Sequence, residues 1–135
     1  MKIEEHEKAY KEHLRNLNRG IEEGSEENQR NIGYNISQGS VELLAIFLHK
    51  LSLLQVGDQL DHRVFKNKSL IEKRLPPDFP EKKKILELIR EIELERNAIC
   101  YGTRKPELRI EKMIKIFNEL RELINKHLKQ NQKNP

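Results

Sequence analysis

The stretch from Val41 to Val56 constrains the fold most, because its apolar side chains surround a helix on nearly every side. Its titratable residues are Glu42, His49 and Lys50, and it is shorter than the roughly 20 apolar residues that a membrane-spanning helix needs. A helix of this kind has to be covered on several faces by other helices. We therefore expect it to be the central helix of a protein without a membrane-spanning segment.

Apolar residues at helical spacing recur along the rest of the chain, and turn-forming residues separate them. The expected helices cover residues 3–21, 25–56, 65–75, 81–100 and 106–130, and the 65–75 helix is the shortest. No stretch alternates apolar and polar residues as a half-buried strand does. The sequence predicts an all-α fold, an up-and-down bundle of four main helices plus one short helix. We expect residues 1–130 to form a single helical domain and residues 131–135 to be a frayed polar tail.

Capping residues set the expected helix boundaries. Ser25 is the expected N-cap of the second helix, whose end is expected near Gly57. Asp78 is the expected N-cap of the fourth helix, with Pro80 in its first turn. Gly102 stands just past the expected end of that helix, where glycine is common.

Cysteine usage and charge limit the function classes. Cys100 is the only cysteine, so a disulfide framework is excluded. Lys and Arg number 26 against 22 Asp and Glu, and the positive excess lies in residues 81–135. This half would attract an anionic partner first. Residues 1–11 are rich in Glu and unlike a signal peptide, and we expect a cytoplasmic protein.

Arg96 stands where the pattern of the fourth helix calls for an aliphatic residue. The apolar seam steps by three and four residues through Ile85, Ile89, Ile92, Arg96 and Ile99. A buried guanidinium without a partner costs several kcal/mol, so Arg96 needs an acid, a wet cleft or an anionic ligand. One alternative is that Arg96 snorkels past the seam or pairs with Glu42, Glu93 or Glu95, and the other is that it binds a phosphate.

The sequence around Arg96, ERNAICYG at residues 95–102, resembles the signature of the HEPN superfamily of small helical domains. That signature is an Arg, usually followed by a polar residue, with a His four to six residues further on, just before the final helix. Arg96 and Asn97 match its first two positions, and Tyr101 stands in the place of the His. The resemblance implies a homodimer with an RNA-facing cleft, in which Arg96 holds the phosphate and Asn97 orients it.

Active members of this superfamily cut RNA without a metal or other cofactor, and the Arg stabilises charge while the His moves protons. A tyrosine, with a pKa near 10, is a poor base at neutral pH. By resemblance, the function is therefore either a toxin-type endoribonuclease of a toxin–antitoxin pair, with a nucleotidyltransferase partner, or a catalytically inactive helical adaptor for that nucleotidyltransferase. The third alternative is a helical bundle with a purely structural role, in which Arg96 is a buried ion-pair member.

Further polar residues are candidates for contact with RNA or a nucleotide. Arg104 and Lys105 follow the motif and are placed to attract phosphates. Asn31, Asn35 and Gln38 share one face of the second helix, which is either a solvated polar face or the opposite wall of the Arg96 cleft.

Two further patterns leave their roles open or predict none. The small residues Gly33, Ser37 and Ser40 suit close packing, either between two copies or inside the bundle. The histidines predict no metal site, because His6 and His13 are expected to be exposed and His62 to be solvated in a loop.

Overall fold

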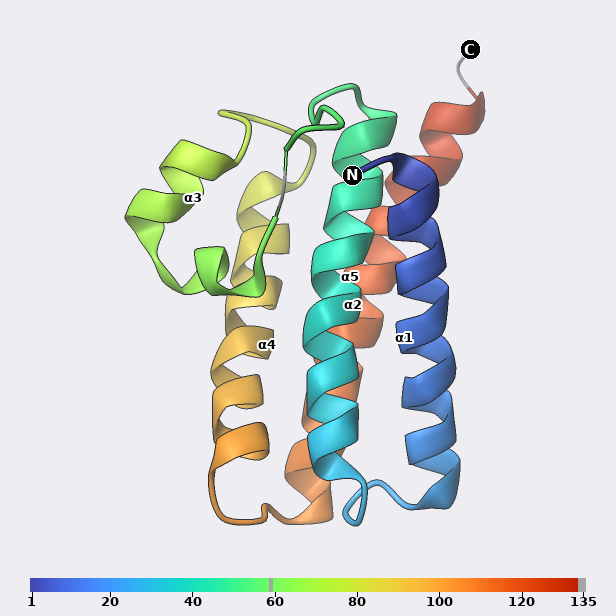
Figure 1. Ribbon diagram of the computed structural model, residues 1–135, viewed down its shortest axis with the longest axis vertical. Coiled ribbons are helices and arrows are strands. Elements are labelled where there is room, and N and C mark those ends of the chain that lie inside the picture. The colour runs from blue at the N-terminus through green and yellow to red at the C-terminus, as the bar shows by residue number, and fades with distance from the viewer. Residues whose placement is uncertain (59, 134–135) are drawn as a thin grey trace.

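The computed structural model describes residues 1–58 and 60–133, and within them the chain forms an up-and-down bundle of helices (Figure 1). The long helices are α1 (Ile3–Glu23), α2 (Gln29–Lys50), α4 (Lys82–Tyr101) and α5 (Glu107–Lys133). A 3₁₀ helix, η1 (His62–Lys66), and the short helix α3 (Lys68–Arg74) lie in the connection between α2 and α4. The predicted all-α bundle is confirmed, and no described residue belongs to a strand.

Helix α2 is the centre of the bundle. It packs against α1, α4, α5 and η1, whereas α1 packs mainly on α2 (Figure 1). Tyr10 of α1 also accepts a hydrogen bond from Nε of Arg121 on α5, at 3.2 Å. Ile36, Leu44, Phe47 and Leu48 of α2 are fully buried, as the all-round apolar pattern predicted. Buried residues of all four long helices form one core. Because α2 is surrounded, the face on which a polar side chain of α2 lies determines which helix it contacts.

The end of α2 differs from the prediction, because the helix stops at Lys50 and not near Gly57. Ser52 adopts a left-handed conformation, with φ of 59°, directly after the last turn. The amide of Leu53 donates to the carbonyl of Leu48 at 2.8 Å, and the amide of Ser52 donates to that of His49 at 3.0 Å. These two bonds form a Schellman motif, which usually has glycine at the left-handed position. With serine there, the sequence does not mark the helix end.

The start of α2 also lies later than predicted, since the helix begins at Gln29 after a turn at residues 25–28. Asn28, not Ser25, is the N-cap residue. Gln29 is fully buried, and its side-chain amide donates to the carbonyls of Glu26 at 2.9 Å and Lys105 at 3.0 Å. The amide of Lys105 donates back to Oε1 of Gln29 at 2.8 Å. The helix start is therefore fixed to the α4–α5 turn.

The predicted 65–75 helix is divided into two pieces by Asn67. The side chain of Asn67 accepts hydrogen bonds from the amides of Ser69 and Leu70 and so caps α3. Glu81, with φ of 61°, is the N-cap residue of α4, so the prediction that Asp78 takes this role is wrong.

The last helix follows Pro106 as predicted and continues to Lys133, and residues 134–135 of the expected frayed tail lie outside the described residues. Among the described helices, none has the length and apolar character needed to cross a membrane.

Candidate functional site

Arg96 lies on the side of α4 that packs against α2. It is 7% exposed, and the isoleucines of its seam are at most 1% exposed. They are Ile85, Ile89, Ile92 and Ile99. The prediction that a guanidinium occupies a core position is confirmed, and its partners decide what it can do.

A hydroxyl, and not a carboxylate, is the hydrogen-bond partner of Arg96. Nη1 of Arg96 donates to Oγ of Ser37 on α2 at 2.9 Å, and this hydroxyl donates to Oε1 of Glu93. Glu93 is fully buried one turn before Arg96, and its Oε2 accepts from Nδ1 of His62 at 2.9 Å. We call these four residues, with Tyr34, the Arg96 cluster. Its one acid is bonded to Ser37 and His62.

The guanidinium of Arg96 retains donors that the described residues do not use. Its Nε is buried without a hydrogen-bond partner, and Arg96 forms no ion pair with any described residue. The guanidinium carbon lies 5.3 Å from the centre of the Tyr34 ring, a cation–π arrangement. Tyr34 is 47% exposed, so the ring connects the buried guanidinium to the surface.

Asn97 and Tyr101 do not converge on Arg96 within this chain. Asn97 is exposed, and Tyr101 is the last residue of α4, with 73% exposure. Helix α4 is unbroken up to Tyr101, and five helical positions place that side chain on a different face from Arg96. Tyr34, which the sequence analysis did not consider, is the aromatic residue beside Arg96.

The small residues of α2 serve packing inside the bundle. A Cβ added to Gly33 would lie 3.2 Å from both Sγ of Cys100 and Cγ2 of Ile99, so α4 approaches α2 closely there. Ser37 belongs to the same strip and holds the Arg96 cluster. Burial raises the pKa of the Cys100 thiol, and the charge of Arg96 partly opposes this shift. Cys100 is therefore a packing residue that stays protonated at neutral pH.

The basic residues after α4 have partners within the chain. Nη2 of Arg104 donates to the carbonyl of Glu27 at 2.9 Å, and Lys105 is held through its backbone by Gln29. Arg109 forms a two-bond ion pair with Glu95, at 2.9 and 3.2 Å. Arg104 is exposed and Lys105 partly exposed, so both add positive charge beside the end of α4.

The amide face of α2 is divided, because Asn35 turns toward α1, which neither alternative from the sequence had considered, while Asn31 is exposed. Asn35 is 3% exposed, its Oδ1 lies 2.8 Å from Nδ1 of His13, and its amide donates to Asn31. Gln38 is partly exposed on the same helix. With its side chain bonded to α1, Asn35 has no group left for RNA, and the prediction that His13 is exposed is wrong because it is partly buried.

A second buried polar group joins the start of α1 to the second half of α2, and we call His6, Glu42 and His49 the His6 cluster. His6 is 5% exposed, contrary to the prediction, and its Nδ1 lies 2.5 Å from Oε2 of Glu42. The rings of His6 and His49 have centroids 5.2 Å apart. Burial lowers the pKa of His49, and the charge of His6 lowers it further.

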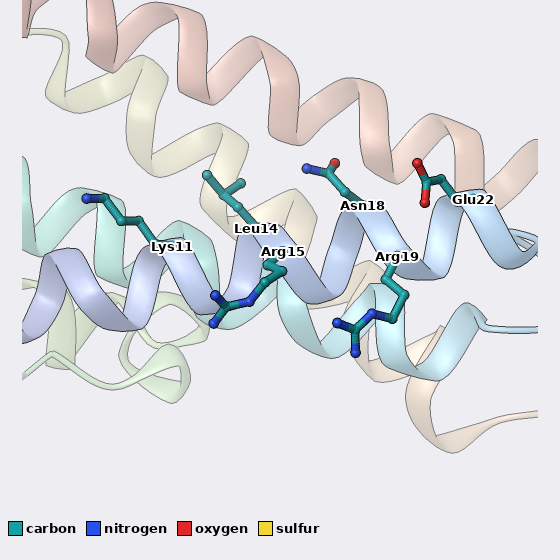
Figure 2. A pocket seen from close by; sticks show the side chains of 6 residues that line it. All are labelled: Lys11, Leu14, Arg15, Asn18, Arg19 and Glu22. Atoms are coloured by element: carbon teal, nitrogen blue, oxygen red, sulfur yellow. The ribbon is translucent and has the colours of Figure 1, made fainter.

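Away from α4, the outer surface of α1 has a shallow hollow of about 500 Å³ (Figure 2). Lys11, Arg15 and Arg19 follow one another every four residues along it, and Leu14, Asn18 and Glu22 complete its lining. Because α1 contacts α2 and not α4, this basic stripe lies on the opposite side of α2 from Arg96.

Two members of the Arg96 cluster were not predicted, namely His62 and the bridging hydroxyl of Ser37. His62 was expected to be solvated, and its position 31 residues before Glu93 gives no local signal of their contact. The three-residue spacing of Glu93 and Arg96 on one helix did indicate that the two share a face.

Comparison of the chain with family models, curated proteins and solved structures finds no match.

Proposed function

We propose that this protein is a HEPN-type RNA-binding protein that acts as a homodimer and holds an RNA phosphate with Arg96. The observation that carries the proposal is the bonding of Arg96. Its guanidinium is buried in an apolar seam, donates to the hydroxyl of Ser37, forms no ion pair with the described residues, and leaves Nε without a partner. An anion that accepts from the remaining donors would relieve the cost of burying this charge.

The neighbours of Arg96 suit a nucleic acid better than a small anion. Tyr34 presents an exposed ring beside the guanidinium, and single-stranded RNA is commonly held by stacking of its bases on such rings. Arg104 and Lys105 add positive charge beyond the end of α4. The proposed ligand is therefore single-stranded RNA, with its phosphate on Arg96 and a base on Tyr34, in a protein of the cytoplasm.

Exposed apolar side chains on α4 support the proposed homodimer. Leu94 is 56% and Tyr101 73% exposed, and their seven-residue spacing places them on one face of the helix. A second copy that covers this face would bring two Arg96 residues into one assembly. Sedimentation of the protein at micromolar concentration should show a dimer, and Leu94→Glu should shift it to monomer. A monomeric wild-type protein contradicts this part of the proposal.

RNA binding is tested by fluorescence anisotropy with a labelled single-stranded RNA of mixed sequence at moderate salt. Arg96→Met removes the guanidinium and keeps an apolar side chain in the seam. We expect at least a roughly tenfold loss of affinity, since a hydrogen bond to a charged group is worth about 1.5–3 kcal/mol. The matched control is Arg90→Met, an exposed residue of the same helix, which should bind within about twofold of wild type.

The unfolding midpoint of each variant shows whether a loss of binding reflects a loss of fold. A folded Arg96→Met protein with wild-type affinity would contradict the proposal. A wild-type protein that does not bind RNA at all, together with a sharp stability loss in Arg96→Ala, would leave Arg96 a purely structural residue.

Cleavage is the further step of this proposal, in which Arg96 stabilises the charge on the phosphate as the ribose 2′-hydroxyl attacks. The P–O5′ bond breaks, and water takes the proton of the 2′-hydroxyl and gives one to the leaving 5′-oxygen. Incubation of the protein with RNA in EDTA should give products ending in 2′,3′-cyclic phosphate. Arg96→Ala should abolish these products, and unchanged cutting by that variant would contradict the role of Arg96.

The exposed position of Tyr101 favours a second function, a catalytically inactive adaptor for a nucleotidyltransferase. With α4 unbroken, the residue in the place of the motif His points away from Arg96. This alternative predicts no RNA turnover by wild-type protein and co-purification with a nucleotidyltransferase encoded beside it. RNA turnover that depends on Arg96 rules it out.

A further inference from the structure

Two histidines in the α1–α2 interface each leave a buried ring nitrogen unused. Nε2 of His6 and Nε2 of His49 are fully buried, and neither has a hydrogen-bond partner among the described residues. Figure 1 shows why they meet, because the N-terminal end of α1 lies beside the C-terminal end of α2. Buried polar atoms are rarely left unsatisfied, so this pair points to an occupant.

Glu42 determines which ring nitrogen of His6 faces the carboxylate and which is left for an occupant. Its carboxylate accepts from Nδ1 of His6 at 2.5 Å, so Nδ1 carries the hydrogen, and Nε2 offers a lone pair when the ring is neutral. A carboxylate on the far ring nitrogen is the usual support of a metal-binding histidine, because it fixes the ring and raises the basicity of the other nitrogen. Glu42 precedes His49 by about two helical turns on α2, so both residues lie on the side of α2 that His6 contacts.

The spacing of the two rings fits a shared ion. Their centroids are 5.2 Å apart and their planes are inclined by 42°. Zinc–imidazole bonds of about 2.0–2.1 Å place two ring centroids about 5 Å apart when both nitrogens bind one ion at a tetrahedral angle.

We propose that His6 and His49 bind one borderline transition-metal dication, such as Zn²⁺, through their Nε2 atoms, with water in the remaining positions. The described residues contain no group of three His, Cys, Asp or Glu side chains placed to hold a metal. The site is therefore a two-histidine site, weaker than a structural zinc site with four protein ligands. This proposal does not depend on the proposed RNA binding.

The test uses the full chain without a histidine tag, freed of metal by a chelator, and titrated with Zn²⁺ by calorimetry. We expect one ion per chain with a micromolar dissociation constant, and at least a roughly tenfold weaker affinity in His49→Gln. Glu42→Gln keeps both ligands and should weaken binding about tenfold. His13→Gln is the matched control, since His13 is another histidine of α1 that is bonded to Asn35, and it should bind as wild type.

Copper gives a readout that does not depend on affinity. The electron paramagnetic resonance spectrum of the Cu²⁺-loaded protein should show two imidazole nitrogens, and one in His49→Gln. Absence of binding by the wild-type protein overturns the proposal and leaves a bridging water as the occupant. Binding that His49→Gln leaves unchanged, in a protein whose unfolding midpoint shows it folded, also overturns it.

Discussion

The two sides of α2 both carry buried polar groups, but they differ in the kind of charge that they hold. On the α4 side, the Arg96 cluster contains a guanidinium that is always charged and a fully buried carboxylate. On the α1 side, the polar groups are imidazoles and amides, with Glu42 as the acid. Imidazoles and amides can be neutral, whereas Arg96 cannot. The comparison teaches that the α4 side buries a permanent cation, while the α1 side buries histidines and amides that can be neutral.

The largest effect expected from this comparison is that of Glu93→Gln. The substitution keeps the shape of the side chain and removes the buried carboxylate that accepts from Ser37 and His62, which is expected to destabilise the fold by about 3–5 kcal/mol. Denaturant unfolding measures this loss. Glu91→Gln, an exposed acid of the same helix, is the control and should change stability by less than about 0.5 kcal/mol. A loss below about 1 kcal/mol in Glu93→Gln would contradict a structural role for the buried carboxylate.

A smaller loss is expected when the acid of the α1 side is neutralised. Glu42→Gln weakens the bond to His6 and is expected to cost about 1–3 kcal/mol in denaturant unfolding, because no permanent cation is left behind. Glu12→Gln, on the exposed side of α1, is the control. A cost larger than that of Glu93→Gln would reverse the comparison between the two sides.

Ser37→Ala tests the bridge between acid and base. Its hydroxyl accepts from Arg96 and donates to Glu93, so its removal leaves both without this partner and is expected to cost about 1–2 kcal/mol. Ser40 is an equally buried serine of α2, but its hydroxyl donates to the carbonyl of Ile36 in its own helix. Ser40→Ala should therefore be close to neutral, and equal losses in the two variants would contradict the bridge.

The smallest effect concerns the reactivity of Cys100. Burial raises the pKa of its thiol, so alkylation by iodoacetamide at pH 8 should be slower than that of an exposed thiol and should rise above pH 9. Because the native thiol holds its proton more tightly than the unfolded one, the same shift lowers folding stability as the pH rises through this range. Arg96→Met removes the charge that opposes the shift and should slow alkylation at pH 8 further. Faster alkylation in the folded variant would contradict this electrostatic coupling.

Periodicity predicted the helices and the burial of Arg96, because both depend on local spacing. The end of α2 was not predicted, because Ser52 adopts the left-handed conformation that glycine usually marks at a helix end. The amide face of α2 was assigned to solvent or to a cleft, because spacing shows which residues share a face and not which helix covers it. Likewise, the contact of His62 with Glu93 depends on where η1 returns to α4, which only the tertiary structure fixes.

Gln29 joins the start of α2 to the turn between α4 and α5, and this link limits how Tyr101 can move. Its side-chain amide donates to the carbonyl of Lys105 and accepts from the amide of Lys105. These two bonds fix the turn after α4 to the first turn of α2. Unwinding the last turn of α4 to bring Tyr101 toward Arg96 would require these two hydrogen bonds to break first. In the proposed homodimer, a second copy would supply its own tyrosine without breaking these hydrogen bonds.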